Sequence, residues 1–122
     1  MKIKYSKIIP VKGFFAINLF GTVFVRKEYE ASVKAFPERY ETTWNHEAIH
    51  TEQIKECLYV FYYPLYLLFW IIRLLTPPFE TAYRDISFEQ EAFEHENELD
   101  YLKTRKPYNW LGYMFKSSRK KN

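Results

Sequence analysis

Residues 46–50 read His-Glu-Ala-Ile-His in this chain of 122 residues. Two histidines four positions apart lie one above the other on the same face of an α-helix, so both imidazole rings can bind one metal ion. A glutamate directly after the first histidine lies beside that ion, where it can accept a proton from a metal-bound water. The pentapeptide therefore predicts a helical metal site, with His46 and His50 as ligands and Glu47 as the catalytic base.

The pentapeptide belongs to a segment that has the pattern of an amphipathic helix over residues 42–57. Thr42 or Thr43 can cap the first turn, because their hydroxyl oxygens accept hydrogen bonds from free N–H groups. Gln53 follows His50 by one turn, so its amide can hold a ligand by a hydrogen bond or simply be buried. The predicted inner face consists of His46, Ile49, His50, Gln53 and Cys57.

The segment before this helix is predicted to form a small antiparallel sheet over residues 1–27. Short apolar and β-branched stretches there are separated by Gly13 and Gly21, a pattern typical of two or three strands joined by turns. Residues 28–41 are polar and contain Pro37, which indicates a loop or a short helix.

Residues 58–75 form the most apolar segment, with no charged side chain before Arg73 and with a proline at Pro64. A helix that crosses a bilayer needs about 20 apolar residues, so we predict a buried core helix, bent at Pro64. Peripheral membrane contact through residues 58–75 is the alternative, because tyrosine and tryptophan near the ends of such a segment suit a lipid interface.

A second amphipathic helix is predicted over residues 85–103, followed by a packed segment over residues 107–122. The apolar stripe of this helix consists of Phe88, Ala92, His95, Leu99 and Leu102. The acidic side chains expected on its solvated face include Glu94, Glu96 and Glu98.

The predicted metal site needs a third protein ligand, because catalytic zinc usually has three protein ligands and one open position. Position 56, six residues after His50, is Glu56 rather than histidine, so the ligand must come from another segment. Glu89 and Glu91 lie about 200° apart on a helix, so only one of them can face the metal ion. Glu89 is the preferred third ligand, and Glu91 is the alternative.

Two further polar residues are candidates for a place near the site. His95 lies on the apolar stripe, where it is either a core histidine or a hydrogen-bond partner close to the metal ligands. Tyr83 lies just before the second helix, where its hydroxyl can polarise a substrate carbonyl.

The pattern His46-Glu47-x-x-His50, followed by a hydrophobic helix and then by Glu89-Gln90-Glu91-Ala92, resembles the gluzincin branch of the zincin metallopeptidases. It is also similar to small HExxH proteins of bacteria. The resemblance covers about residues 20–103 and implies a minimal zincin-like domain with a sheet, an active-site helix and a ligand helix. It further implies Zn²⁺ as the cofactor, Glu89 as the third ligand and a peptide or protein as the substrate. Phe93 stands where gluzincins often carry an acidic residue.

Length and composition fit one α+β domain over residues 1–122, with the sheet followed by three to four helices. The single cysteine, Cys57, excludes an intramolecular disulfide, and residues 1–15 lack the apolar stretch of a signal peptide. We therefore expect a cytoplasmic protein, with membrane association as the alternative. The net charge of +3 is mild and only the last seven residues are strongly basic, so no nucleic-acid partner is expected.

The leading functional hypothesis is a zinc-dependent metallohydrolase, most directly a peptidase. The alternatives are a catalytically silent zincin-like protein that binds a metal or a partner, and a membrane-associated structural protein. The sequence specifies neither the substrate nor the oligomeric state.

Overall fold

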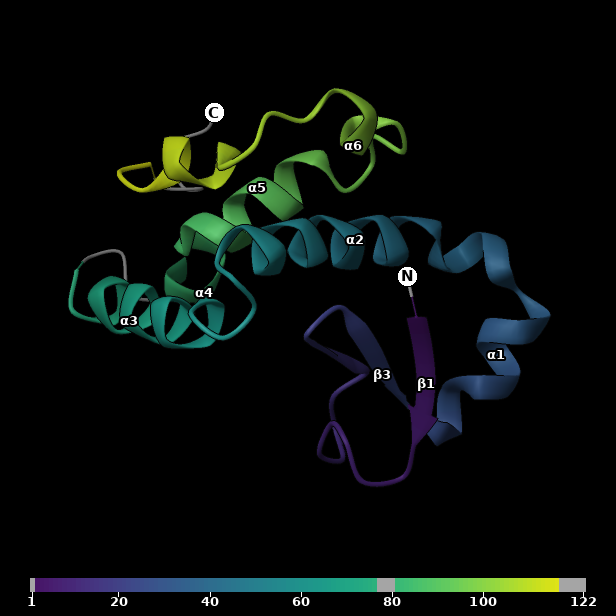
Figure 1. Ribbon diagram of the computed structural model, residues 1–122. Helices are drawn as coiled ribbons and strands as arrows, with labels where there is room; N and C mark the ends of the chain where they lie inside the picture. The colour runs from purple at the N-terminus through teal and green to yellow at the C-terminus, as the bar shows by residue number, and fades with distance from the viewer. Residues whose placement is uncertain (1, 77–80, 117–122) are drawn as a thin grey trace.

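The computed structural model describes residues 2–76 and 81–116. It confirms the predicted α+β class, with a three-stranded sheet at the N-terminus followed by helices (Figure 1). The strands are β1 (Lys2–Ser6), β2 (Ala16–Leu19) and β3 (Thr22–Arg26). The α-helices are α1 (Glu30–Ala35), α2 (Glu41–Glu56), α3 (Tyr62–Leu74), α4 (Ala82–Asp85), α5 (Ser87–His95) and α6 (Tyr101–Thr104). Short 3₁₀ helices cover Lys27–Tyr29, Pro37–Tyr40 and Asn109–Tyr113.

The sheet is mixed rather than antiparallel throughout. β2 and β3 form the expected antiparallel hairpin, whose turn places Phe20 and Gly21 at φ values of 55° and 92°. β1 instead pairs in parallel with β3, so the strand order is β1-β3-β2. Residues 7–15 are long enough to pass from one edge of β3 to the other, a distance of about 10 Å. Because β2 reverses the chain direction before β3 begins, β1 and β3 run the same way.

α2 matches the predicted helix over 42–57 to within one residue at each end, but its expected cap is absent. Thr42 and Thr43 lie inside the helix, which starts at Glu41 directly after the 3₁₀ turn Pro37–Tyr40 and has no side-chain cap. The buried face of α2 is largely polar and consists of Asn45, His46, Ile49, His50, Gln53 and Ile54.

α3 is shorter than the helix predicted over residues 58–75. Leu58 and Tyr59 adopt left-handed backbone conformations, with φ of 55° and 65°, and so separate α2 from α3. Pro64 falls in the first turn of α3, where its missing N–H has no intrahelical partner to lose, so the expected bend is wrong. No helix in the described part of the chain is both long and apolar enough to cross a bilayer.

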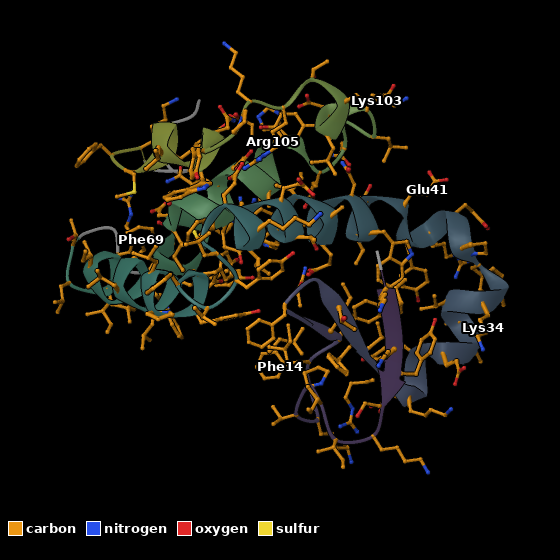
Figure 2. The ribbon with its side chains drawn as sticks, viewed as in Figure 1. Phe14, Lys34, Glu41, Phe69, Lys103 and Arg105 are labelled. Carbon is orange, nitrogen blue, oxygen red and sulfur yellow. The ribbon has the colours of Figure 1, made fainter. Side chains whose placement is uncertain are left out.

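Only one face of α3 is buried, so the prediction of a core helix holds for that face alone. Tyr62 and Phe69 contact Phe88 with ring centroids 4.6 and 5.5 Å apart, and Phe88 also contacts Trp110 at 4.7 Å. Figure 2 shows Phe69 on the side of α3 that faces α5. The opposite face of α3 is exposed, with Leu67, Leu68, Ile71, Ile72 and Leu75 among its side chains.

The single helix predicted over residues 85–103 is broken in two places. Ile86 is extended between α4 and α5, with φ −59° and ψ 131°. After His95 the chain leaves the helix because Asn45 Nδ2 donates to the carbonyl oxygens of His95, Glu96 and Glu98, at 3.1, 2.8 and 3.0 Å. Leu99, expected on the buried stripe, therefore lies in the turn and is 55% exposed.

Replacing Asn45 by alanine should lower the free energy of unfolding by about 1–3 kcal/mol, because three backbone carbonyls lose their donor. Urea unfolding of the metal-free protein, followed by circular dichroism, measures this difference. The matched control is Asn97→Ala, since Asn97 is exposed and accepts only from Thr42, and it should change stability by less than about 0.5 kcal/mol. Equal effects of the two substitutions would contradict the assigned role of Asn45.

Candidate metal centre

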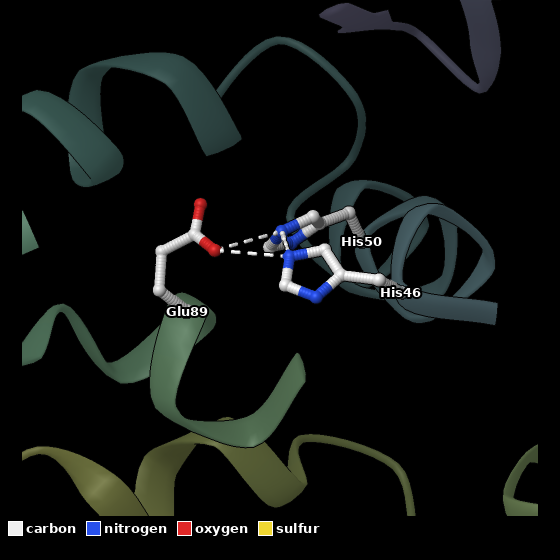
Figure 3. A group of neighbouring side chains, drawn as sticks. All are labelled: His46, His50 and Glu89. Atoms are coloured by element: carbon white, nitrogen blue, oxygen red, sulfur yellow. Dashed lines mark hydrogen bonds and ion pairs between the residues drawn. The ribbon is translucent and has the colours of Figure 1, made fainter. Parts of the chain in front are cut away.

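His46, His50 and Glu89 meet in the interior between α2 and α5 (Figure 3). The Nε2 atoms of the two histidines are 3.1 Å apart, and each lies 3.2 Å from Oε1 of Glu89. All three residues are buried, so these atoms have little access to bulk water. The four-residue spacing on one helix brings the rings together, and α5 crosses α2 where Glu89 can reach both.

The outer ring nitrogens of both histidines face hydrogen-bond acceptors. His46 Nδ1 lies 2.8 Å from Glu96 Oε1, and His50 Nδ1 lies 2.8 Å from Gln53 Oε1. The Gln53 amide is oriented by its own nitrogen, which donates to Phe88 O and Glu91 Oε1, both at 2.9 Å. With acceptors on this side, each Nδ1 carries a proton, so Nε2 is the nitrogen that would bind a metal ion once it is deprotonated.

Three potential ligand atoms thus converge on one buried position, an arrangement that a shared cation would stabilise. Ligand atoms of a tetrahedral site with bonds of 2.0–2.1 Å lie about 3.3 Å apart, close to the 3.1–3.2 Å separations found among these atoms. Two imidazoles and a carboxylate also match the donor set of zinc and of related divalent metals. The residues present therefore fit a divalent metal ion.

Charge coupling in this group favours a cation. Burial disfavours the charged form of His50, but the adjacent Glu89 carboxylate outweighs this and raises the pKa of His50 to about 9. Burial alone would raise the pKa of Glu89, yet His50 and His46 hold it well below its ordinary range. The carboxylate of Glu89 therefore stays ionised and provides the negative charge that a metal ion would balance.

Glu47 lies beside this group and lines the same cavity, which has a volume of about 310 Å³. Burial raises the pKa of Glu47, and the positive charges of His50 and His46 lower it in part. Strand β2 forms the opposite wall, because Asn18 Nδ2 donates to Glu47 O and Thr51 Oγ1, both at 3.0 Å. A carboxylate with a raised pKa is a stronger base than an ordinary glutamate, and this one lies next to three convergent ligand atoms.

Tyrosine hydroxyls surround the remaining part of the cavity. Tyr66 donates to Glu89 Oε2 at 2.7 Å, and Tyr62 lies 3.3 Å from His50 Nδ1. Burial and the Glu89 charge raise the pKa values of Tyr62, Tyr66 and Tyr83, so all three remain protonated donors. Tyr83, a candidate from the sequence, lines the cavity. Tyr66 also lines it, but nothing in the sequence distinguishes Tyr66 among the 11 tyrosines.

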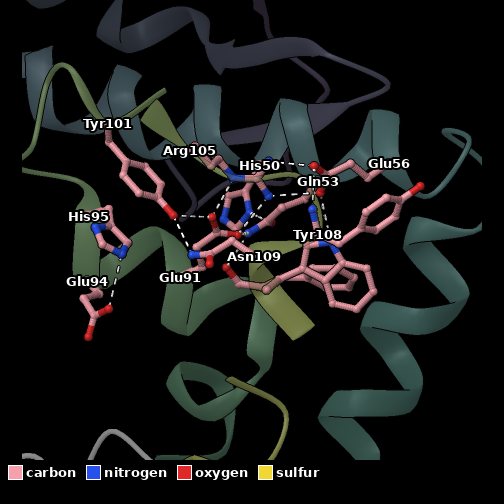
Figure 4. A network of polar contacts seen from close by, with 12 residues as sticks. His50, Gln53, Glu56, Glu91, Glu94, His95, Tyr101, Arg105, Tyr108 and Asn109 are labelled. Atoms are coloured by element: carbon pink, nitrogen blue, oxygen red, sulfur yellow. Dashed lines mark hydrogen bonds and ion pairs between the residues drawn. The ribbon is translucent and has the colours of Figure 1, made fainter. Parts of the chain in front are cut away.

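Of the two carboxylates considered as third ligand, Glu91 points away from the histidines and is fully buried in another ion pair (Figure 4). Arg105 binds it in a bidentate way, with Nε–Oε2 and Nη2–Oε1 distances of 2.6 and 3.1 Å. Tyr101 donates to Glu91 Oε2 at 2.7 Å. Glu91 still influences the site, because it holds the Gln53 amide that holds His50.

Arg105 connects this ion pair to the end of α2. Its Nη1 and Nη2 atoms lie 2.7 and 3.0 Å from the carboxylate oxygens of Glu56. Glu56 in turn accepts from Trp110 Nε1 at 3.0 Å and from the backbone N–H of Tyr108 at 2.9 Å. The segment after α6 is therefore held on α2 and α5 by charge as well as by apolar packing.

Two residues near the site have partners that the sequence left open or placed elsewhere. His95 does not lie at the metal-ligand group but stacks on Tyr101 with a centroid distance of 3.8 Å and contacts Glu98. Glu96, expected on the solvated face, is the partner of His46. Its position seven residues after Glu89, two helical turns along the same face, was the available signal.

No protein-family model, no curated protein and no solved structure matches this chain. The resemblance to gluzincins therefore rests on the His46–His50 pattern and on the geometry of the group it forms with Glu89.

The affinity of the metal-free protein for Zn²⁺ should rise with pH up to about pH 9. His50 has its pKa raised to about 9, so below that pH a metal ion must displace a proton from the ligand group. One displaced proton gives about a tenfold gain in apparent affinity for each pH unit. Competition with a chromophoric chelator between neutral pH and pH 9 measures this slope. His46→Ala and Glu89→Gln should each weaken binding, and a pH-independent affinity would contradict the ligand assignment.

Replacing Arg105 by methionine should lower the free energy of unfolding by about 3–5 kcal/mol, because Glu91 is then buried without its counter-ion. Burial opposes ionisation of Glu91, but the Arg105 hydrogen bonds outweigh it and lower the pKa of Glu91. The stabilisation is therefore present above the ordinary pKa of a glutamate and is lost as pH falls through the lowered value. Chemical unfolding at neutral and acidic pH should show the larger penalty at neutral pH.

The exposed Lys103 provides the matched control for this substitution, and Lys103→Met should leave stability nearly unchanged. Adding Glu91→Gln to Arg105→Met should recover part of the loss, since the unpaired charge is removed. Absence of any recovery would mean that Arg105 stabilises the protein by packing alone.

Proposed function

We propose that this protein is a zinc-dependent metallohydrolase of the gluzincin type, with His46, His50 and Glu89 as ligands and Glu47 as the base. The observation that carries the proposal is the convergence of three buried ligand atoms beside a second carboxyl group, that of Glu47, in one cavity. The Nε2 atoms of the two histidines lie 3.1 Å apart, a separation that two ligands of one metal ion would also have.

A bound zinc ion would supply Lewis acidity and a water molecule that loses its proton near pH 7. Glu47 is the residue that accepts this proton, because it lines the cavity and its raised pKa suits proton transfer. Glu96 and Gln53 hold the two histidines in the required tautomer. Tyr66 and Tyr83 are protonated donors in the cavity and can hydrogen-bond a substrate oxygen that gains negative charge.

The cavity wall formed by β2 favours an extended peptide as the substrate. β2 is an edge strand, and Ala16, Ile17 and Asn18 line the cavity. Tyr63 hydrogen-bonds Asn18 O and the N–H of Phe20, and so covers one end of the free edge. A peptide strand would therefore pair at the Ala16 end, where its carbonyl groups run past Glu47.

Replacing Glu47 by glutamine should reduce peptide cleavage by about 10²-fold or more while leaving zinc binding intact. The amide keeps the size of the side chain but cannot accept the proton. Turnover of a mixed library of fluorescence-quenched peptides by the zinc-loaded protein measures the effect, and elemental analysis checks the metal content.

The matched control is Glu52→Gln on the same helix, since Glu52 makes a solvent-accessible ion pair with Lys55. It should retain wild-type turnover. Full activity in Glu47→Gln would remove Glu47 from the mechanism. A wild-type protein that holds one zinc ion and cleaves no peptide would favour a catalytically silent metal-binding protein.

A further inference from the structure

The loop between β1 and β2 and the helix α3 lie on the same side of α2, opposite α5, α6 and the C-terminal 3₁₀ helix (Figure 1), and both expose apolar side chains. The loop exposes Ile8, Val11 and Phe14, and α3 exposes the side chains of its outward face. Together they are called the apolar face here, and its principal side chains are Ile8, Val11, Phe14, Leu68, Ile71, Ile72 and Leu75.

The loop presents its apolar side chains in a fixed shape. Ile8, Val11 and Phe14 are 79%, 65% and 63% exposed. Arg26 Nη1 donates to Lys7 O and Pro10 O at 2.8 and 3.1 Å, so the backbone is held from inside. A hollow of about 350 Å³ lies among these apolar residues. Exposed apolar side chains on a braced loop are typical of an interaction surface.

The second part of the apolar face is the outward face of α3, a helix that is too short to cross a bilayer. It has 13 residues, whereas a spanning helix needs about 20. Its inward face packs through Tyr66 and Phe69 on the core, and its outward face exposes large aliphatic side chains. Trp70 lies at the margin and is 40% exposed. This division fits a helix that lies in the plane of a membrane interface.

Charge distinguishes a lipid surface from other partners. Residues 1–27 contain six lysines and arginines and no acidic residue, and residues 57–79 also contain no acidic residue. Lys7 and Lys12 are exposed and border the apolar loop residues. A second copy of the chain would bring these lysines against each other, whereas anionic headgroups would attract them.

We propose that the apolar face docks on the surface of an anionic lipid bilayer, with the loop side chains and the outward face of α3 in the headgroup region. Ile17 lines both the loop hollow and the cavity that holds Glu47, so the cavity lies next to the docked surface. If the proposed hydrolase function holds, its substrate is reached at the membrane surface. The docking itself does not depend on the metal site.

Sedimentation of the full chain with large vesicles tests the proposal. The protein should bind vesicles of phosphatidylcholine mixed with phosphatidylglycerol, bind phosphatidylcholine alone more weakly, and lose binding as salt is added. The double variant Lys7→Glu/Lys12→Glu should weaken binding to the mixed vesicles about tenfold or more. The triple variant Ile8→Ser/Val11→Ser/Phe14→Ser should weaken binding to both kinds of vesicle.

Matched control variants change the same residue types elsewhere. Lys103 lies on the far side of α2 from Phe14 (Figure 2), and Lys55 is exposed on α2. Lys55→Glu/Lys103→Glu and the exposed pair Leu99→Ser/Leu111→Ser should bind vesicles like the wild type. Zinc content should be unchanged in every variant, which separates failure of docking from failure of the metal site.

Three results would overturn the proposal. The first is a wild-type protein that binds neither kind of vesicle. The second is a loss of binding in the control variants equal to that in the face variants. The third is a dimer, measured by light scattering, that the face variants dissociate while vesicle binding stays the same.

Discussion

The buried face of α2 carries polar side chains, and the need to pair them governs how the other elements pack. Asn45, His46, His50 and Gln53 all point into the interior. A buried polar group without a partner costs about 1–3 kcal/mol, so each must find one on another element. α5 and the turn after it supply these partners through carbonyl oxygens and carboxylates. An apolar α2 would pack on α5 in many registers, whereas these hydrogen bonds select one.

The same constraint divides the two nearby carboxylates of α5 between different roles. Both carboxylate oxygens of Glu91 are bound by Arg105, so Glu91 is held in a separate ion pair. Glu89 pairs with no guanidinium in residues 2–76 and 81–116 and faces two imidazoles, which makes it the negative charge of the candidate metal site. The Gln53 amide hydrogen-bonds both Glu91 and His50, so the position of Glu91 influences that of His50. Arg105 therefore influences the position of His50 through Glu91 and Gln53, without contacting His50 itself.

The molecule is also divided by charge between its two sides. The carboxylates that contact the ligand histidines are Glu89 on α5 and Glu96 directly after it, while the sheet and α3 are basic or apolar. β2 and α3 nevertheless provide two walls of the cavity and also border the exposed apolar face. The cavity of the candidate metal site therefore lies beside the apolar face.

The sequence alone determined the α+β class, the extent of α2 and the pairing of His46 with His50, because these depend on local spacing along one helix. It also indicated that α3 is too short to cross a bilayer. Tertiary structure decided the contacts between segments, which spacing along one helix leaves open. Because α5 crosses α2, Glu89 contacts the histidines and Glu91 contacts Arg105. The hydrogen bonds of Asn45 to backbone carbonyls end α5 at His95. The parallel pairing of β1 and the exposure of Leu99 likewise followed from contacts between segments distant in sequence. Helical periodicity places a side chain on a face, but only packing determines which neighbour that face meets.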